Sequence, residues 1–161
     1  HCLRLITNCS KKFPKVLEGE FLQNTNGFES IINMCAKVLG INSSKEFEDM
    51  ALNTSMTSGI QIDMKLVNLD GINYLDYRKV VQSIMAYKMA DVDNITLIYS
   101  FYESLSEFIC NYVNEIAKEI NVKDIVLCGN MFANSILFTK TNKTLSKTYN
   151  IILPKEYPLD Y

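Results

Sequence analysis

Residues 123–161 constrain the fold of this chain most, because they read as a strand, a glycine turn, a helix and a second strand. The apolar segment Lys-Asp-Ile-Val-Leu runs into Cys128-Gly129-Asn130, and a helical segment then leads to Tyr-Asn-Ile-Ile-Leu-Pro. In many α/β proteins this order directs backbone N–H groups at a phosphate or a nucleoside. The pattern is common, so it indicates an α/β unit first and a nucleotide site second.

The composition is that of an ordinary globular protein. With 161 residues, 48% of them hydrophobic, the chain can bury one sizeable core. We predict a single domain over 1–161, with a mainly helical part at 1–122 and the strand–turn–helix–strand unit at 123–161. A net charge of −2 lacks the basic surface of nucleic-acid binders. No apolar run reaches the roughly 18 residues of a membrane span. We therefore expect neither nucleic acid nor membrane as a partner.

The five cysteines form no C-x-x-C pair and no zinc-ligand spacing, and their number is odd. Cys35 and Cys110 stand among helical apolar residues, where a reduced thiol acts as a small hydrophobic side chain. We therefore expect a reducing, cytoplasmic location. The first residues, His-Cys-Leu-Arg, include no initiator Met and no signal peptide. We interpret them as an internal start in a longer protein.

Apolar spacing predicts four helices before residue 123. The first covers 28–39 and ends at Gly40, and the second begins at Ser43 or Ser44 with Glu46 placed for a capping box. The third covers 74–90, and after a turn at 91–94 the fourth covers 95–120, a length of nearly 40 Å. Two short segments, 3–7 and 60–66, have the pattern of strands.

Few residues suit catalysis. The single histidine, His1, is terminal, which argues against a Ser/His/Asp centre, a Cys/His centre or a histidine metal cluster. Glu48 and Asp49 belong to an acidic group at a helix start, where carboxylates complement the helix dipole. Asp160 follows the strand at 151–153, at an edge where α/β proteins place site residues. An ordinary surface aspartate is the alternative for that position.

Three regions, in order along the chain, resemble the C-terminal half of the HypF-like carbamoyltransferases, which are related to the tRNA threonylcarbamoyladenosine synthesis protein TsaD. Residues 26–30 leading into 36–41 are similar to the family's S-x-G-R-L-F-D-A-V-A-A-L-L-G helix, and residues 45–51 to Y-E-G-Q-A-A-M. Residues 99–107 and 124–134 are similar to F-H-x-x-L-A-E and V-V-L-S-G-G-V-F-Q-N.

The resemblance implies an α-rich α/β fold, the C-terminal lobe of an actin-like ATPase (ribonuclease H-like) domain, with long helices on a small sheet and a terminal βαβ unit. It also implies binding of ATP, with carbamoyl-adenylate as intermediate. The residues expected to contact the nucleotide are Glu48, Gly129, Asn130, Met131 and Asn134.

The resemblance further assigns Asp160 to an iron or zinc site in the intact protein, completed by histidines of the preceding half. The implied partners are that missing N-terminal lobe and an acceptor protein of hydrogenase maturation that carries a thiol. Joined to its other half the chain would be part of a carbamoyltransferase, and alone we expect no turnover. A lobe without its partner should expose an apolar surface, so we also expect self-association.

Several positions depart from the family pattern. Asp49 and Asn130 replace family glycines, Cys128 replaces a serine, and Tyr102 replaces the histidine of F-H. These departures leave a second hypothesis open, in which the chain is a diverged, non-catalytic actin-like lobe that acts as a binding or scaffold module.

Overall fold

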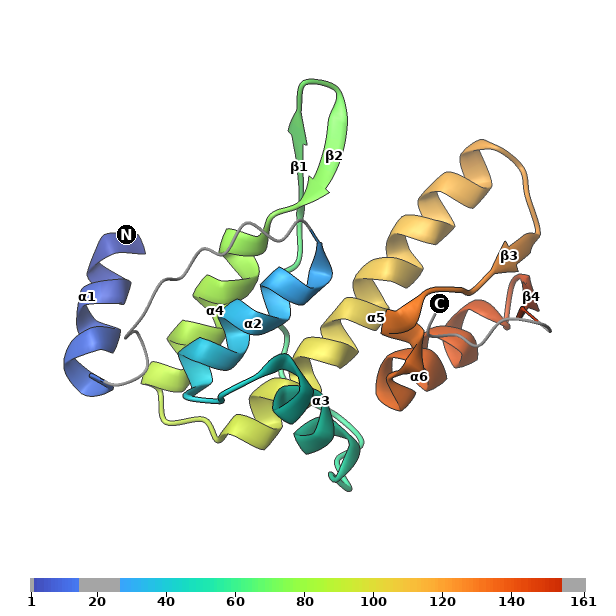
Figure 1. Ribbon diagram of the computed structural model, residues 1–161. Helices are drawn as coiled ribbons and strands as arrows, with labels where there is room; N and C mark the ends of the chain where they lie inside the picture. The colour runs from blue at the N-terminus through green and yellow to red at the C-terminus, as the bar shows by residue number, and fades with distance from the viewer. Residues whose placement is uncertain (1, 15–26, 155–161) are drawn as a thin grey trace. The chain divides into compact units, whose positions relative to one another are not determined.

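The computed structural model describes residues 2–14 and 27–154 (Figure 1). They form two compact units, one within residues 1–100 and one within 101–161. The elements in chain order are α1 (Cys2–Lys12), α2 (Phe28–Leu39), α3 (Ser44–Leu52), β1 (Leu66–Leu69), β2 (Ile72–Leu75), α4 (Tyr77–Met89), α5 (Asn94–Glu119), β3 (Asp124–Val126), the 3₁₀ helix η1 (Asn130–Ala133), α6 (Ser135–Leu145) and β4 (Asn150–Ile152). The coarse prediction of a helix-rich α/β protein is confirmed.

The first unit is a helical cluster in which α2 packs against α3 and α4, and α1 packs against α4. Apolar residues at steps of three and four put one face of each helix inside. Gly40 ends α2 as predicted, with φ 73° and its N–H bonded to the carbonyls of Ala36 and Lys37. The side chains buried in this unit are mainly apolar and include Ile32, Cys35, Val38, Leu39, Phe47, Val80, Ile84, Leu97 and Ile98.

Of the two caps predicted for the second helix, the structure uses Ser43. Its Oγ accepts the N–H of Glu46 at 3.1 Å, while the Glu46 carboxylate accepts the N–H of Asn42 at 3.2 Å. Two N–H groups at the start of α3 thus receive side-chain acceptors, as in a capping box shifted by one residue.

Residues 3–7 were predicted as a strand, and this is wrong, because they lie within α1. A short apolar run does not distinguish a strand from a helix by its pattern alone. Here the helical form lets α1 pack on α4 and bury Cys9 completely. Tertiary packing therefore decides the conformation of this segment.

The strand predicted at 60–66 is also wrong for residues 60–65, which pair with no strand among the described residues. Side-chain hydroxyls satisfy the backbone instead: Ile60 N–H donates to Ser100 Oγ at 2.9 Å, and Asp63 N–H to Ser83 Oγ at 3.2 Å. Ile62 is fully buried. The alternating pattern in this segment thus arises because every second side chain is more buried, and not because the segment pairs in a sheet.

β1 and β2 form an antiparallel hairpin in which Leu69 pairs with Ile72. The two turn residues, Asp70 and Gly71, have φ of 53° and 83°, the two positive values of a type I′ turn. The helix predicted from residue 74 begins only at Tyr77, because Asp76 caps it and accepts the N–H of Arg78 at 3.2 Å.

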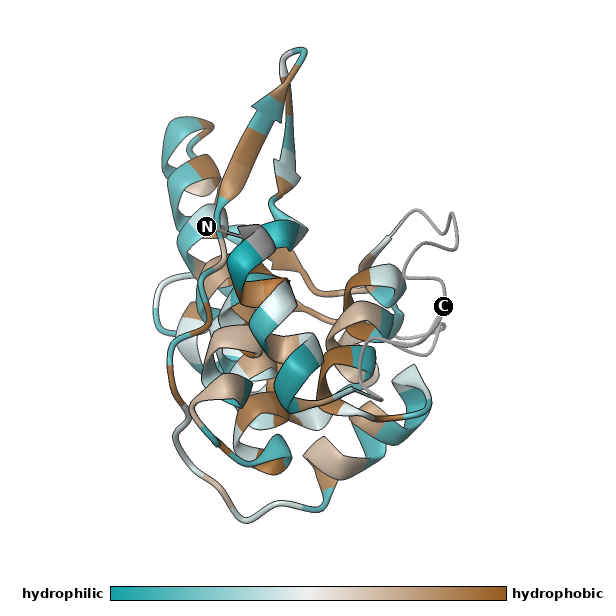
Figure 2. Cartoon of the chain, turned by 90° about the vertical axis from the view of Figure 1, so that its left-hand side faces the viewer, coloured by the Kyte–Doolittle hydropathy of each residue, from teal (hydrophilic) through white to brown (hydrophobic). Residues whose placement is uncertain are grey.

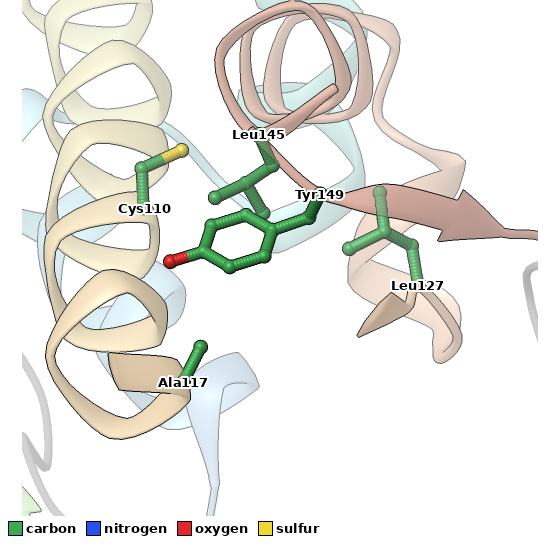
Figure 3. Close-up of a cluster of buried hydrophobic side chains, with 5 residues drawn as sticks. All are labelled: Cys110, Ala117, Leu127, Leu145 and Tyr149. Carbon is green, nitrogen blue, oxygen red and sulfur yellow. The ribbon is translucent and has the colours of Figure 1, made fainter. Parts of the chain in front are cut away.

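The second unit contains the rest of α5, the parallel pair β3–β4, η1 and α6. This confirms the strand–turn–helix–strand order predicted for residues 123–161, up to the last described residue. Figure 3 shows Tyr149 pointing toward α5 between Cys110 and Ala117, with Leu145 and Leu127 beside it. Ile125 and Ile151 of the sheet pack against this cluster.

A second contact joins α5 to α6. Thr141 Oγ1 and Ser106 Oγ are 2.9 Å apart and buried, and Lys140 forms an ion pair with Glu103. Cys35 and Cys110 are both buried, as predicted. Among the described helices none combines the length and the apolar content needed to cross a membrane.

We expect Leu145→Ala to lower the free energy of unfolding by about 2–5 kcal/mol, because it removes a 1% exposed side chain from the cluster around Tyr149. Urea unfolding followed by circular dichroism measures this change. Ile120→Ala is the control, since Ile120 is 60% exposed and should change stability by less than about 0.5 kcal/mol. Equal effects of the two substitutions would contradict this description of the core.

Candidate nucleotide-binding residues

The turn after β3 holds four of the five predicted nucleotide contacts. β3 ends at Val126, the N–H of buried Leu127 donates to the carbonyl of Ile152 at 3.1 Å, and Cys128 is exposed. Gly129 then turns the chain away from the sheet with φ 109° and ψ 151°. The strand–glycine turn predicted from the sequence is therefore present.

The backbone conformation of Gly129, and not crowding around it, explains why a glycine stands here. A Cβ built on it would meet no atom within 4 Å, so the folded chain leaves room for a side chain there. The constraint is the backbone, because φ near 109° lies in the region that L side chains rarely adopt. Glycine is therefore required by the backbone angle of the turn, independently of any ligand.

The turn leads into η1 before α6 begins, instead of running straight into the helix as predicted. Asn130 begins η1 and is not among the described residues with positive φ, although asparagine tolerates that region. The first N–H groups of a helical turn have no intrahelical acceptor. Those of Asn130 and Met131 also find none elsewhere in the described part of the chain. Asn130 is exposed, and Gly129 and Met131 are half-buried.

Asn134 is the N-cap of α6 and is only 6% exposed. Its Oδ1 accepts the N–H groups of Ile136 at 3.1 Å and Leu137 at 3.2 Å. The cap therefore occupies the donors that α6 would otherwise offer to an anion. An anion at this turn could meet the N–H groups of η1, whereas those of Ile136 and Leu137 are already bonded.

The other end of the Asn134 side chain is unsatisfied. Its Nδ2 is buried and has no hydrogen-bond partner among the described residues. A buried amide without an acceptor costs free energy. Because solvent does not reach this atom, an acceptor oxygen of a bound molecule would meet it only if the turn opened.

Glu48, the fifth predicted contact, lies on α3 in the first unit. It is half-buried between the fully buried Phe47 and the exposed Asp49. Desolvation raises the pKa of Glu48 most, and the negative charges of Asp49 and Glu29 raise it further. This carboxyl group is therefore held in an environment that disfavours its charge.

The predicted metal ligand, Asp160, lies outside the described residues. Within residues 2–14 and 27–154, no three His, Cys, Asp or Glu side chains gather in a way that could hold a metal ion. A metal role for Asp160 stays a prediction, and the chemistry derived below uses no metal.

No pattern in the sequence indicated the contacts that hold α6 against α5. The Ser106–Thr141 hydrogen bond and the Glu103–Lys140 ion pair join residues 35 and 37 positions apart. The unsatisfied Nδ2 of Asn134 was also unforeseen, because a sequence shows only that asparagine can cap, not which of its atoms remain unpaired. A capping pattern, Asn134 followed by an apolar helix, was the one available clue.

Two solved structures share this fold. One is the crystal structure of full-length HypF in the phosphate- and nucleotide-bound form, with a TM-score of 0.73 and 17% identity over 83% of this chain and 18% of that chain. The other is HypF of T. kodakarensis, with a TM-score of 0.67 and 15% identity over the same shares. The chain spans under a fifth of the length of either structure.

A curated relative, protein HydE of Wolinella succinogenes, is 28% identical over 87 residues, which are 54% of this chain and 16% of HydE. The family model described as "Carbamoyltransferase, Kae1-like Domain, second subdomain" matches residues 27–160. That match covers well over half of the sequence and includes every nucleotide contact predicted above. The chain therefore belongs to the Kae1-like carbamoyltransferase domain family, as a second subdomain.

Proposed function

We propose that this chain is the C-terminal part of a HypF-like carbamoyltransferase, with an actin-like lobe that binds ATP and carbamoyl-adenylate during hydrogenase maturation. The family match over residues 27–160 carries the proposal. The N–H groups of Asn130 and Met131 support it, because they have no acceptor among the described residues and lie on the turn where the resemblance places nucleotide contacts.

The proposed chemistry divides the donors and acceptors between the parts of a nucleotide. The N–H groups of Asn130 and Met131 would hold a phosphate oxygen, as backbone amides at a glycine turn do. The half-buried Glu48 carboxylate would accept hydroxyl donors of the ribose, as acidic side chains do in dinucleotide-binding folds.

The reaction proposed for the intact protein is carbamoyl transfer to a thiol of a partner protein. The thiolate sulfur attacks the carbonyl carbon of carbamoyl-adenylate, and the bond from that carbon to the phosphate oxygen breaks. AMP leaves with the electron pair, and the thiol proton passes to solvent. Donors around the phosphate stabilise the charge that develops on the departing AMP.

A second candidate function is a diverged binding or scaffold module without catalysis. The acidic residues Glu29 and Asp49 favour it, because their charges raise the pKa of Glu48 and would repel a triphosphate nearby. ATP binding separates the two functions: a chain without affinity for ATP at millimolar concentration would support the scaffold.

The first test of the nucleotide site is Gly129→Ala. Forcing a Cβ into positive φ should move the turn and weaken ATP binding by about tenfold, which corresponds to the usual strain of 1–2 kcal/mol. Calorimetry and amide shifts in NMR spectra measure binding. Gly71→Ala is the control, because Gly71 also has positive φ and open space around it but lies in the hairpin. Equal losses in both variants would contradict the assignment.

Asn134 allows its two roles to be separated. Asn134→Ser keeps an oxygen for the cap but removes Nδ2, so stability should stay within about 1 kcal/mol while ATP affinity falls. Asn134→Ala removes both and should also cost about 0.5–2 kcal/mol of stability. If Asn134→Ser binds ATP as the unchanged chain does, Asn134 is a cap only.

Glu48 gives a pH signature. Its pKa is raised in the folded chain, so the folded state binds more protons than the unfolded state between the ordinary value near 4.5 and the raised one. Stability therefore falls as pH rises through this window. Glu48→Gln should raise the free energy of unfolding at pH 7, with the gain vanishing below the ordinary pKa, and should weaken ATP binding.

Urea unfolding from pH 4 to 8 measures the stability effect, and calorimetry measures the binding. Glu119→Gln is the control, because Glu119 is exposed at the end of α5. A gain in stability at pH 7 without any loss of ATP affinity would show that the burial of Glu48 serves something other than nucleotide binding.

A further inference from the structure

The β1–β2 hairpin has one face made of apolar side chains. Because residues alternate between faces, Val67, Leu69, Ile72 and Tyr74 share one side. Leu69 is 54% exposed, Ile72 58% and Tyr74 47%. On the opposite face Asn68 donates to Asn73 at 2.8 Å. Both faces are largely exposed, so among the described residues no layer covers the apolar one.

The hairpin packs mainly on itself. Neither strand shares more than a marginal contact with a described helix, and Figures 1 and 2 show the hairpin extending beyond the helices of its unit, with apolar colouring on its strands. An isolated two-stranded hairpin is marginally stable in water. A further strand would stabilise it by adding backbone hydrogen bonds and by widening the apolar face.

The outer edge of β1 is open and carries no charge. The N–H of Asp76 donates to the carbonyl of Lys65, so by the antiparallel alternation the backbone groups of Leu66 and Asn68 point away from β2. No described strand pairs with that edge. Natural proteins block such edges with lysine, proline or bulges, and residues 66–69, Leu-Val-Asn-Leu, contain none of these.

We propose that the outer edge of β1 pairs with the same edge of a second copy of this chain, antiparallel and with Asn68 on the two-fold axis. In this register Val67 faces Leu69 of the partner copy, so the apolar faces of the two hairpins become continuous. The result is a four-stranded sheet in the order β2–β1–β1–β2. This inference does not depend on the proposed function.

Charge favours the β1 edge over the β2 edge. With Asn68 on the axis, Lys65 of each copy lies opposite Gly71 of the other, within reach of Asp70. Among the described residues, Lys65 forms an exposed ion pair with Asp63 at 3.3 Å. Pairing through β2 in the corresponding register would instead put Asp76 opposite Asp70 of the other copy, where like charges repel.

The dimer should be weak. A stable interface uses about 20–30 residues from each partner, and this edge offers only a few. We therefore expect association at high micromolar to millimolar concentration, measured by sedimentation velocity over a concentration series. A chain that stays monomeric up to about 1 mM, a concentration corresponding to roughly −4 kcal/mol of binding, would overturn the proposal.

Cysteine crosslinking tests the register. Residues facing each other in a hydrogen-bonded antiparallel pair have Cα atoms about 5.5 Å apart, within the range of a disulfide. In a background with Cys2 and Cys128 replaced by serine, Asn68→Cys should form a covalent dimer under mild oxidation. Asn73→Cys is the control, since two such residues would be about three strand spacings apart, roughly 14 Å. Crosslinking of Asn73→Cys in place of Asn68→Cys would overturn the proposal.

Charge reversal tests the contact between Lys65 and Asp70. Lys65→Glu should raise the dimer Kd by roughly two- to thirtyfold, as expected for two exposed ion pairs, and Lys65→Glu with Asp70→Lys should recover part of the loss. Lys79→Glu makes the same change in net charge at an exposed position of α4 and should leave Kd unchanged. Equal effects of Lys65→Glu and Lys79→Glu would mean that net charge, not this register, sets the association.

Discussion

Burial along α5 is the constraint on which both units depend. This helix supplies Leu97 and Ile98 to the first unit and Leu105, Cys110 and Ala117 to the second, all at most 3% exposed. In the second unit, Tyr149 and Leu145 pack on its side, and β3 and β4 pack on them in turn. Without that apolar side the short parallel pair would have no layer to cover it, and parallel strands need such cover.

The turn at Gly129 depends on this packing. β3 is only three residues long, and its partner β4 is positioned by Tyr149 and Ile151. Once the strand is held, the positive φ of Gly129 sends the chain into η1, and the Asn134 cap starts α6. The donors proposed to bind a nucleotide are thus the N–H groups of Asn130 and Met131, which the Asn134 side-chain oxygen does not accept. A binding turn that is fully satisfied internally would have nothing to offer a ligand.

Local signals predicted much of the fold. Gly40 was identified as the end of one helix, and Ser43 or Ser44 as the start of the next, because capping depends on residues within one turn of each other. The 26-residue helix α5 was recognised because a long apolar repeat admits few alternatives. The segments at 3–7 and 60–65 were misread because a few apolar residues fit a helix, a strand or a buried loop equally well. Their conformations follow from packing on α4 and from the hydroxyls of Ser83 and Ser100.

The sequence by itself determined the family, the helix-rich α/β class and the residues at which nucleotide contacts are expected, because motifs, caps and periodicities are local. Only the tertiary structure decided that the backbone angle of Gly129 requires a glycine and that Glu48 is desolvated beside other acids. The same structure decided that Asn134 caps α6 while its Nδ2 has no partner among the described residues. It also decided that one face of the hairpin stays apolar and uncovered. These properties depend on burial and on partners distant in sequence, which no local pattern encodes.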